Sequence, residues 1–339
     1  MHTSARVQRK EILLLLFVPI VFTLALSAQS TGSPPAWAYP AASPDYKPPV
    51  DNGELRHVPG SSAAWTLTQV SDRFFAPDWH PEEHPPLPLV VARGRKPDVF
   101  ACGFCHRAEG TGGPENANLT GLSPAYIVQQ MADFKSGARK SSLPNRIPSK
   151  LMTDVAKSAT AAEIAEAAAY FSRIKPRKLI TVVEAEDVPK NYVAGWVYSP
   201  LAEKEKEEGK VNGVEGTEPL AGRILEMPKN LEQFESRDTH SEFIAYVPPG
   251  SIAVGKKLAT TTSAGKAFPC VQCHGQDLRG LADVPGIAGR SPSYLFRQLY
   301  DLKHGARKGP NANLMKPVLA NLSEADLTAL CAYAASLNP

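Results

Sequence analysis

The chain has few cysteines, few methionines and little net charge. Five cysteines in 339 residues are too few for a disulfide scaffold. A formal net charge of +3 excludes a strongly basic nucleic-acid-binding protein. The 43% of apolar residues exclude a disordered chain and allow two ordinary domains. The 31 prolines predict that part of the chain is extended or looped.

Long apolar runs are also scarce, and the run near the N-terminus is short. Basic side chains at residues 6–10 precede the apolar run 12–26. A small-residue cleavage pattern follows at 36–38, with Ala28 as a second candidate. The sequence therefore predicts that residues 1–38 are a signal peptide and that the protein is exported to the periplasm. The apolar run is at the lower limit of the length that a membrane-spanning helix needs. An N-terminal anchor that is retained rather than cleaved is therefore the alternative.

The cysteines form two copies of one motif, at residues 102–106 and 270–274, each with the spacing C-x-x-C-H. With this spacing two thiols bond to the vinyl groups of one porphyrin, and the histidine binds the iron. A redox dithiol, a zinc site and a disulfide are the alternatives. A redox dithiol needs no following histidine, and a zinc site usually combines both pairs. The sequence therefore predicts two covalently attached haem c groups, held by Cys102, Cys105 and His106 and by Cys270, Cys273 and His274.

An internal repeat independently relates the two halves of the chain. With a shift of 168 residues, the segment 123–124 (Ser-Pro) falls on 291–292, and 137–140 (Gly-Ala-Arg-Lys) falls on 305–308. Beyond the loop 141–150 the shift becomes 163 residues. A Ser-Pro pair begins a helix and a glycine ends one, so each copy predicts a helix between them. An Ala-rich terminal helix with a capping box follows in each copy.

The methionines indicate the second axial ligand of each iron. Met152 and Met315 coincide under the 163-residue shift, and they lie 46 and 41 residues after the respective haem histidines. A lone methionine usually packs in a core, and Met131 and Met227 have no matching methionine in the other copy. A thioether ligand favours ferrous iron and suits electron transfer. The sequence therefore predicts that Met152 and Met315 are iron ligands.

These features resemble the tandem diheme class I cytochromes c of the cytochrome c-four-like kind. The resemblance covers residues 90–176 and 251–339, about half of the chain. It implies an all-α fold of two class I cytochrome c domains in tandem, and periplasmic electron transfer with no substrate chemistry at the iron. It also implies the ligand pairs, which are His106 with Met152 on one iron and His274 with Met315 on the other.

Two further expectations follow from the family pattern. The family commonly has a proline about eleven residues after the haem histidine, whose carbonyl orients the imidazole. Pro285 fits this place in the second copy, whereas the first copy has Ala117 there and Pro114 nearby. Tyr126 and Tyr294, which coincide in the repeat, are candidate pocket residues near the haems.

The remaining segments give the predicted domain layout. The segment between the haem units carries nine basic and fourteen acidic residues, a net charge of −5. Its runs of β-branched and aromatic residues at 179–183, 192–198 and 243–247 predict short strands. The interpretation favoured here is a packing bridge, and a docking surface is the alternative. The predicted parts are a Pro-rich extended arm (39–89), a first cytochrome c domain (90–176), the acidic bridging segment (177–250) and a second cytochrome c domain (251–339).

The predicted function is therefore that of a periplasmic diheme cytochrome, which passes single electrons between periplasmic or membrane-bound redox proteins and is not an enzyme. A diheme peroxidase-like or thiosulfate-oxidising enzyme is one alternative. Such an enzyme needs a haem with an open or displaceable ligand, and the matched methionines argue against it. The third interpretation is an electron-transfer subunit of a membrane dehydrogenase or oxidase complex, with segment 177–250 as its docking element.

Several other side chains receive plain structural interpretations. His80 and His84 are four residues apart but flanked by prolines, so no helix aligns them as a metal-binding pair. Cys331 is predicted to be a small buried thiol. The basic residues within 135–140 and 303–308 are predicted to form a cationic rim, which is either a solvated surface or a surface that steers acidic partners.

Overall fold

A computed structural model of the chain describes residues 1–2, 33–44, 46–201, 216–262 and 268–339. Residues 33–339 form one compact unit. Residues 3–32 of the predicted signal peptide lie outside the described residues, and so does the charged run 203–210, which the sequence predicts to be a solvated surface loop. Among the described residues, no helix has the length and apolar character needed to cross a membrane.

The first motif lies among five helices, and two of them begin at the caps that the sequence predicts. The side-chain oxygen of Ser123 accepts a hydrogen bond from the backbone N–H of Tyr126 at 3.1 Å, and Gly137 ends that helix with a φ of +76°. Thr160 and Glu163 form the predicted capping box. The helices are α2 (Leu89–Ala92), α3 (Cys102–His106), α4 (Pro124–Ser136), α5 (Ile147–Ser158) and α6 (Ala161–Arg173).

The second motif lies in a similar set of helices. Ser291 caps its helix as Ser123 does, and Ser323 with Asp326 forms a second capping box. Phe296 and Leu327 are fully buried and belong to the core of this half. The helices are α9 (Ser251–Thr260), α10 (Val271–His274), α11 (Pro292–Lys303), α12 (Met315–Leu319) and α13 (Glu324–Ser336), with the 3₁₀ turn η2 (Ala312–Leu314) before α12.

The segment between the two halves contains the expected short strands. The strand β9 (Phe243–Val247) pairs in parallel with β3 (Ile180–Glu184) and antiparallel with β8 (Leu225–Pro228). The run 192–198, predicted as one strand, is instead a hairpin, because Gly195 takes a φ of +59° and turns the chain. The other elements are β5 (Asn191–Ala194) with β6 (Val197–Pro200), β4 (Asp187–Pro189) with β7 (Thr217–Pro219), and helix α8 (Leu231–Glu235).

The Pro-rich arm is more structured than the extended segment that its composition predicted. Trp79 is 1% exposed, and its indole N–H donates to the carbonyl oxygen of Ser236 at 2.8 Å. Burial of such side chains stabilises local structure in the arm. Its elements are the paired strands β1 (Leu55–Arg56) and β2 (Trp65–Thr66) and helix α1 (Leu67–Ser71), and the 3₁₀ turn η1 (Ala36–Ala38) lies just before the arm, within the predicted signal peptide.

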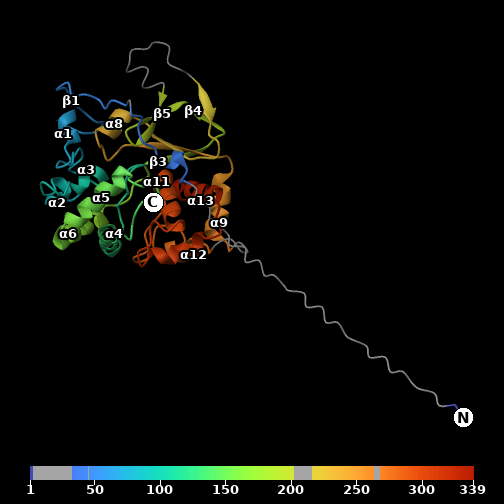
Figure 1. The fold of residues 1–339 in the computed structure, drawn as a ribbon. Coiled ribbons are helices and arrows are strands. Elements are labelled where there is room, and N and C mark those ends of the chain that lie inside the picture. The colour runs from blue at the N-terminus through green and yellow to red at the C-terminus, as the bar shows by residue number, and fades with distance from the viewer. Residues whose placement is uncertain (3–32, 45, 202–215, 263–267) are drawn as a thin grey trace. The chain divides into compact units, whose positions relative to one another are not determined.

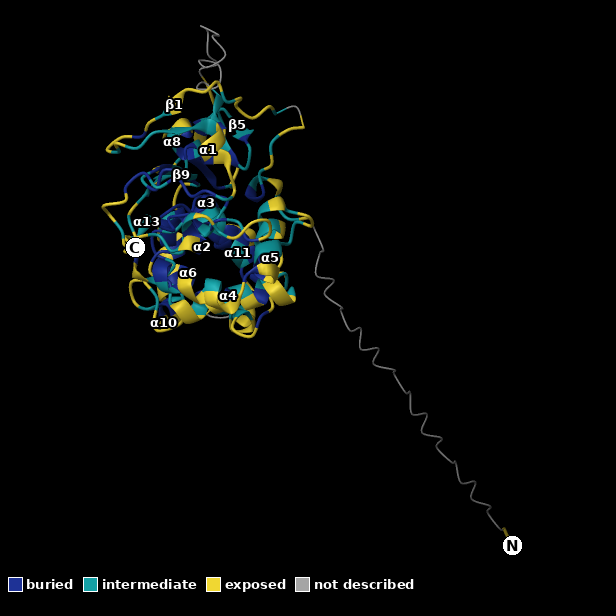
Figure 2. Cartoon of the chain, turned by 90° about the vertical axis from the view of Figure 1, so that its left-hand side faces the viewer, coloured by how far each residue is buried: buried dark blue, intermediate teal, exposed yellow. Residues whose placement is uncertain are grey.

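The strands lie together on one side of the two helical sets (Figure 1). Helices α4, α5 and α6 lie beside α11, α12 and α13 in the same view, and the buried residues gather in the interior around α3, α13 and β9 (Figure 2). Lys178, just before β3, donates from Nζ to the carbonyl oxygens of Ser336 and Leu337 at 2.7 Å each. The ammonium group therefore satisfies carbonyl groups that the end of α13 leaves unpaired.

Candidate functional site: two haem-attachment motifs on one cavity

Both motifs line a single cavity of about 1350 Å³ within the compact unit. Ordinary small-molecule pockets have volumes of roughly 300–1,000 Å³. This cavity is larger, as expected for a space that two cofactors share. Its walls are largely apolar side chains from both helical sets. All eight residues predicted to bind the haems line it, namely Cys102, Cys105, His106, Met152, Cys270, Cys273, His274 and Met315.

The two motif histidines are held in the same way. The Nδ1 atom of His106 lies 2.8 Å from the carbonyl oxygen of Ala117, and Nδ1 of His274 lies 2.8 Å from that of Pro285. Because a carbonyl oxygen only accepts, Nδ1 carries the proton and donates, which leaves the lone pair on Nε2. Burial lowers the pKa of both imidazoles and keeps them neutral. Each ring is thus set to bind a metal through Nε2.

The first copy does not need the proline that the family pattern supplies. Ala117 accepts through its backbone carbonyl, which every residue has. Pro114, the alternative considered from sequence, accepts instead from the guanidinium of Arg297, a residue of the second half. Orientation of the first histidine therefore depends on the path of the backbone eleven residues later, and not on the proline side chain.

The motif cysteines form no disulfide in the described part of the chain, and three of them, Cys102, Cys105 and Cys270, are partly buried. Burial raises the pKa of Cys102 to about 12 and that of Cys270 to about 11. A redox dithiol or a zinc site requires thiolate, which burial disfavours at Cys102 and Cys270. Both pairs line the cavity that a porphyrin would occupy. Cys331 is 1% exposed, so the predicted buried thiol is confirmed.

The matched methionines both line the cavity, Met152 from the middle of α5 and Met315 from the first residue of α12. Met131 on α4 lines it too and packs against the core of the first half, whereas Met227 is buried in β8 away from it. The lining of the cavity alone therefore leaves three methionines as candidate iron ligands. The repeat distinguishes them, because Met131 corresponds to Leu299 in the second copy.

A reciprocal cluster joins the two halves across the cavity. Arg139 donates from Nη1 to Oε1 of Gln130 at 2.8 Å and from Nη2 to Oε1 of Gln298 at 3.0 Å. Arg307 donates to the same two oxygens, at 2.8 Å for Gln130 and 3.1 Å for Gln298. Arg139 also donates to the hydroxyl of Tyr294 at 2.8 Å. Each glutamine is therefore shared by arginines from both copies.

This finding corrects the prediction of a cationic rim. Arg139 is only 8% exposed, and its main chain pairs with that of Arg307 as an isolated antiparallel bridge. Lys140 and Lys308 stay exposed, but their backbone N–H groups donate across the same junction, to Ala306 and Ala138. The repeated Gly-Ala-Arg-Lys segment is therefore the junction between the halves, and only its lysines face solvent.

The cavity holds more positive than negative side chains. Burial lowers the pKa of Arg290 to about 10 and, with repulsion from Arg297, that of Arg146 to about 9. Nη2 of Arg146 and Nη1 of Arg107 are buried and make no hydrogen bond within the described part of the chain. Buried cations need anionic partners. The propionate groups of two haems would supply them, so the residues present fit this cofactor. No local sequence signal distinguishes Arg146, Arg290 or Arg297 from other basic residues of the chain.

The two motif helices differ in how they are covered. Arg237 from the insert donates to the carbonyl oxygen of Phe104 at 3.0 Å and places its guanidinium 3.6 Å from the centre of the Phe104 ring. A Cβ on Gly103 would lie 2.6 Å from Cβ of Ala76, so the arm packs tightly on the same helix. In the second motif Cys273 is exposed. The arm and the insert thus enclose the first motif more than the second.

Comparison with known proteins finds relatives along most of the chain. The chain is 43% identical to cytochrome c-554(548) of Halomonas halodenitrificans over 72 residues, which are 21% of this chain and 87% of that protein. It is 25% identical to cytochrome c4 of Azotobacter vinelandii over 243 residues, covering 70% of this chain and 84% of that one. No family model matches the chain.

A third relative carries a more specific name. The thiosulfate dehydrogenase electron acceptor of Thiomonas intermedia is 23% identical over 244 residues, which are 71% of this chain and 80% of that protein. The match to the Halomonas cytochrome spans most of that protein and about a fifth of this chain, whereas the other two matches span about 70% of this chain. The similarity to those two relatives therefore extends well beyond one motif-bearing segment.

Proposed function

Since the chain belongs to the class I cytochromes c, as a diheme protein related to cytochrome c4, we propose that it carries single electrons between redox proteins outside the cytoplasm through two haems with histidine and methionine ligands. It is an electron carrier with two covalently attached haem c groups. The proposed ligand pairs are His106 with Met152 and His274 with Met315. Their support is that all four line the cavity in which the two motifs meet.

The single observation that carries the proposal is this shared, arginine-rich cavity between the two halves. When bound, the haems supply the reversible one-electron chemistry. The protein contributes neutral histidines fixed through Nδ1 and buried cations that offset the propionates. A carrier needs both irons six-coordinate, since ligand rearrangement slows electron transfer and an open position admits substrate. Carbon monoxide added to the reduced protein should leave its spectrum unchanged, and rapid binding or peroxide turnover would overturn the proposal.

We propose that residues 90–176 and 251–339 each hold one haem, and that 177–250 is the bridge between them. The bridge contacts both sides. Arg237 donates to the carbonyl of Phe104 in the first motif, and the buried carboxylate of Glu226 accepts from Ser291 Oγ at 2.6 Å at the start of α11. The same segment as a partner-docking element remains the alternative. Loss of partner binding without loss of stability in bridge variants would favour that alternative.

The partner proposed here is a dehydrogenase that delivers single electrons, of the kind that the name of the Thiomonas relative indicates. The similarity to that relative extends over 71% of the chain. Purified thiosulfate dehydrogenase with thiosulfate should reduce both haems, seen as the growth of the reduced absorption bands. Absence of reduction, with rapid reduction by a different donor, would leave the carrier function standing and reject this partner.

The location proposed is the periplasm, and the contacts of residues 37–38 support a leader that ends before them. Trp37 packs on Phe296 with ring centroids 4.5 Å apart, and Ala38 is 1% exposed. Arg297 donates to the carbonyl oxygen of Ala38 at 2.9 Å. Cleavage after residue 38 would remove these contacts from the core of the second half. Cleavage near Ala28, the second candidate, retains them.

We therefore expect N-terminal sequencing of the exported protein to begin close to residue 29. If the leader is instead retained as an anchor, the full-length chain will sediment with membranes. A protein that begins at residue 39 and is as stable as the longer form would contradict the packing role of Trp37. The Trp37→Ala variant provides the matched measurement, since removal of a packed aromatic side chain costs about 3 kcal/mol or more.

Neutralising Arg139 should lower the reduction potentials of the haems by tens of millivolts. A nearby cation repels the additional positive charge of ferric iron, so its removal favours the oxidised state. Spectroelectrochemical titration of Arg139→Gln measures the shift. The control is Lys140→Gln, which removes the same charge from an exposed neighbouring side chain. Equal shifts in the two variants would show that the buried position of Arg139 has no special effect.

A further inference from the structure

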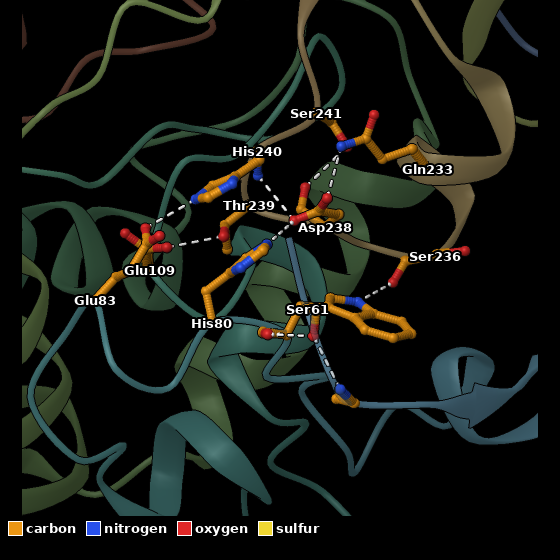
Figure 3. A network of polar contacts seen from close by, with 12 residues as sticks. Ser61, His80, Glu83, Glu109, Gln233, Ser236, Asp238, Thr239, His240 and Ser241 are labelled. Atoms are coloured by element: carbon orange, nitrogen blue, oxygen red, sulfur yellow. Dashed lines mark hydrogen bonds and ion pairs between the residues drawn. The ribbon is translucent and has the colours of Figure 1, made fainter. Parts of the chain in front are cut away.

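A second group of metal-ligand side chains lies outside the cavity, where the arm meets the insert. His80 and Glu83 come from the arm, and His240 comes from the loop between α8 and β9. Each offers a ligand atom, and these atoms lie within 4.8 Å of one another. Figure 3 shows the three side chains gathered with Asp238 between the two chain segments. They are called the His80 cluster below.

One imidazole of the cluster is already oriented as metal-binding histidines are. His80 Nε2 lies 3.0 Å from Oδ1 of Asp238, and the side chains of the two residues are 2% and 0% exposed. The same carboxylate accepts from the backbone N–H of His240 at 3.0 Å and from Nε2 of Gln233 at 2.6 Å. A carboxylate held in this way fixes Nε2–H as the donor and leaves the lone pair on Nδ1. Ligating histidines commonly have such a carboxylate partner on the other nitrogen.

The surroundings of the cluster carry an excess of negative charge. Three carboxylates lie around the cluster, those of Glu83, Glu109 and Asp238, against two guanidinium groups: Arg177 donates to Glu83 and Glu109, and Arg107 interacts electrostatically with Asp238. Glu109 is 1% exposed, and its other oxygen accepts from Thr239 Oγ1 at 2.8 Å. Arg177 donates to Glu83, Glu109 and His240. Its guanidinium thus occupies acceptor atoms of Glu83 and His240 that could instead bind a metal cation.

We propose that the His80 cluster binds a divalent transition-metal ion of the zinc class, through His80 Nδ1, an imidazole nitrogen of His240 and the carboxylate of Glu83. Two imidazoles and one carboxylate are a common zinc ligand set, with water as the fourth ligand. Calcium and magnesium prefer all-oxygen sites, which this cluster is not. The proposal does not depend on the proposed electron-carrier function.

Binding requires two local movements. The rings of His80 and His240 are stacked with centroids 3.8 Å apart and planes 10° apart, so one of them must turn for both lone pairs to converge. His240 is the ring that turns, since its side chain is 30% exposed whereas His80 is fixed by Asp238. Arg177 leaves Glu83 and His240 and keeps its ion pair with Glu109, whose atoms are 2.8 Å apart. The ion then joins the arm to the insert beside the loop that follows the first motif.

The experiment uses the diheme protein, verified to contain two irons per chain, and ZnCl2 alone as the probe. Isothermal titration calorimetry should give one zinc per chain, and elemental analysis after desalting should retain it. His240→Ala should weaken binding by roughly 100-fold or more, and Asp238→Asn by roughly 10- to 100-fold. The matched control is His57→Ala, which removes an exposed arm histidine outside the cluster and should leave binding unchanged.

Arg177→Gln provides the sharpest test, because it distinguishes a metal site from a merely structural network. If Arg177 competes with the ion, this variant binds zinc more tightly than the unmodified protein, even though it loses an ion pair. Absence of zinc binding by the unmodified protein overturns the proposal. So does binding that persists in His240→Ala, or binding that weakens in Arg177→Gln. Zinc should also raise the melting temperature of the unmodified protein and leave that of His240→Ala unchanged.

Discussion

Replacement of Met152 by alanine lowers the reduction potential of one haem by on the order of 100 mV, and Met315→Ala does the same for the other haem. A thioether ligand stabilises ferrous iron, and the identity of the axial ligand sets haem potentials over a range of about 0.8 V. Loss of the sulfur therefore favours ferric iron at that site alone. The position that becomes open on the reduced iron should then bind carbon monoxide.

Spectroelectrochemical titration measures both effects, because each variant should show one shifted and one unshifted haem. Met131→Leu is the control, since Met131 lines the same cavity and Leu299 takes its place in the second half. It should leave both potentials in place. If Met131→Leu shifts a potential while Met152→Ala does not, Met131 is the ligand and the assignment from the repeat is wrong. A shift of both haems in a single-site variant would instead indicate general loosening of the cavity.

Gly255→Ala should lower the free energy of unfolding by about 3 kcal/mol. The substitution should disrupt the packing of α9 against α13 in the second predicted haem domain. A Cβ at this position would lie 1.9 Å from the carbonyl oxygen of Ala329 and 2.8 Å from Cβ of Tyr333. Neither the main chain nor a Cβ can turn aside, so α9 and α13 must separate, and overpacking of this kind costs roughly 1–3 kcal/mol or more. Helix propensity alone predicts that the substitution stabilises the protein by about 1 kcal/mol. The sign of the measured change in stability therefore shows which of the two effects is larger.

Urea unfolding of the holoprotein, followed by circular dichroism, checks this expectation. The neighbouring Val254→Ala is the control, because Val254 is 51% exposed on the same helix. Its effect should be within about 0.5 kcal/mol, as for ordinary surface positions. A Gly255→Ala protein that is more stable than the unmodified one would mean that propensity outweighs the close approach of α9 and α13.

The features that follow local rules could be predicted from the sequence. Serine caps, terminal glycines and capping boxes set the helix ends, and the predicted strands 179–183 and 243–247 correspond to β3 and β9 within one residue. The repeat identified corresponding positions in the two copies, and the structure places all the predicted haem residues on one cavity. These signals lie within a few residues of each other, or are copied from one half to the other.

The contacts between distant segments could not be predicted. The basic run predicts that Arg139 lies in a cationic surface rim, yet Gln298, 159 residues away, accepts its hydrogen bond in the interior. Trp79 and Ser236 are 157 residues apart, so composition suggested an extended arm. His80 was considered with His84, whereas its partners are Asp238 and His240. Spacing along the chain has no information on such pairs.

The shared glutamines of the junction also constrain how the two copies can change. Because Oε1 of Gln130 and Oε1 of Gln298 each accept from both arginines, the effect of a substitution at Arg139 depends on whether Arg307 is present. Effects of contacting residues are generally not additive. After the duplication that the repeat records, neither copy could drift independently at these positions. A replacement at one of these positions is best tolerated when the corresponding residue of the other half changes too, so we expect the two halves to vary together at the junction.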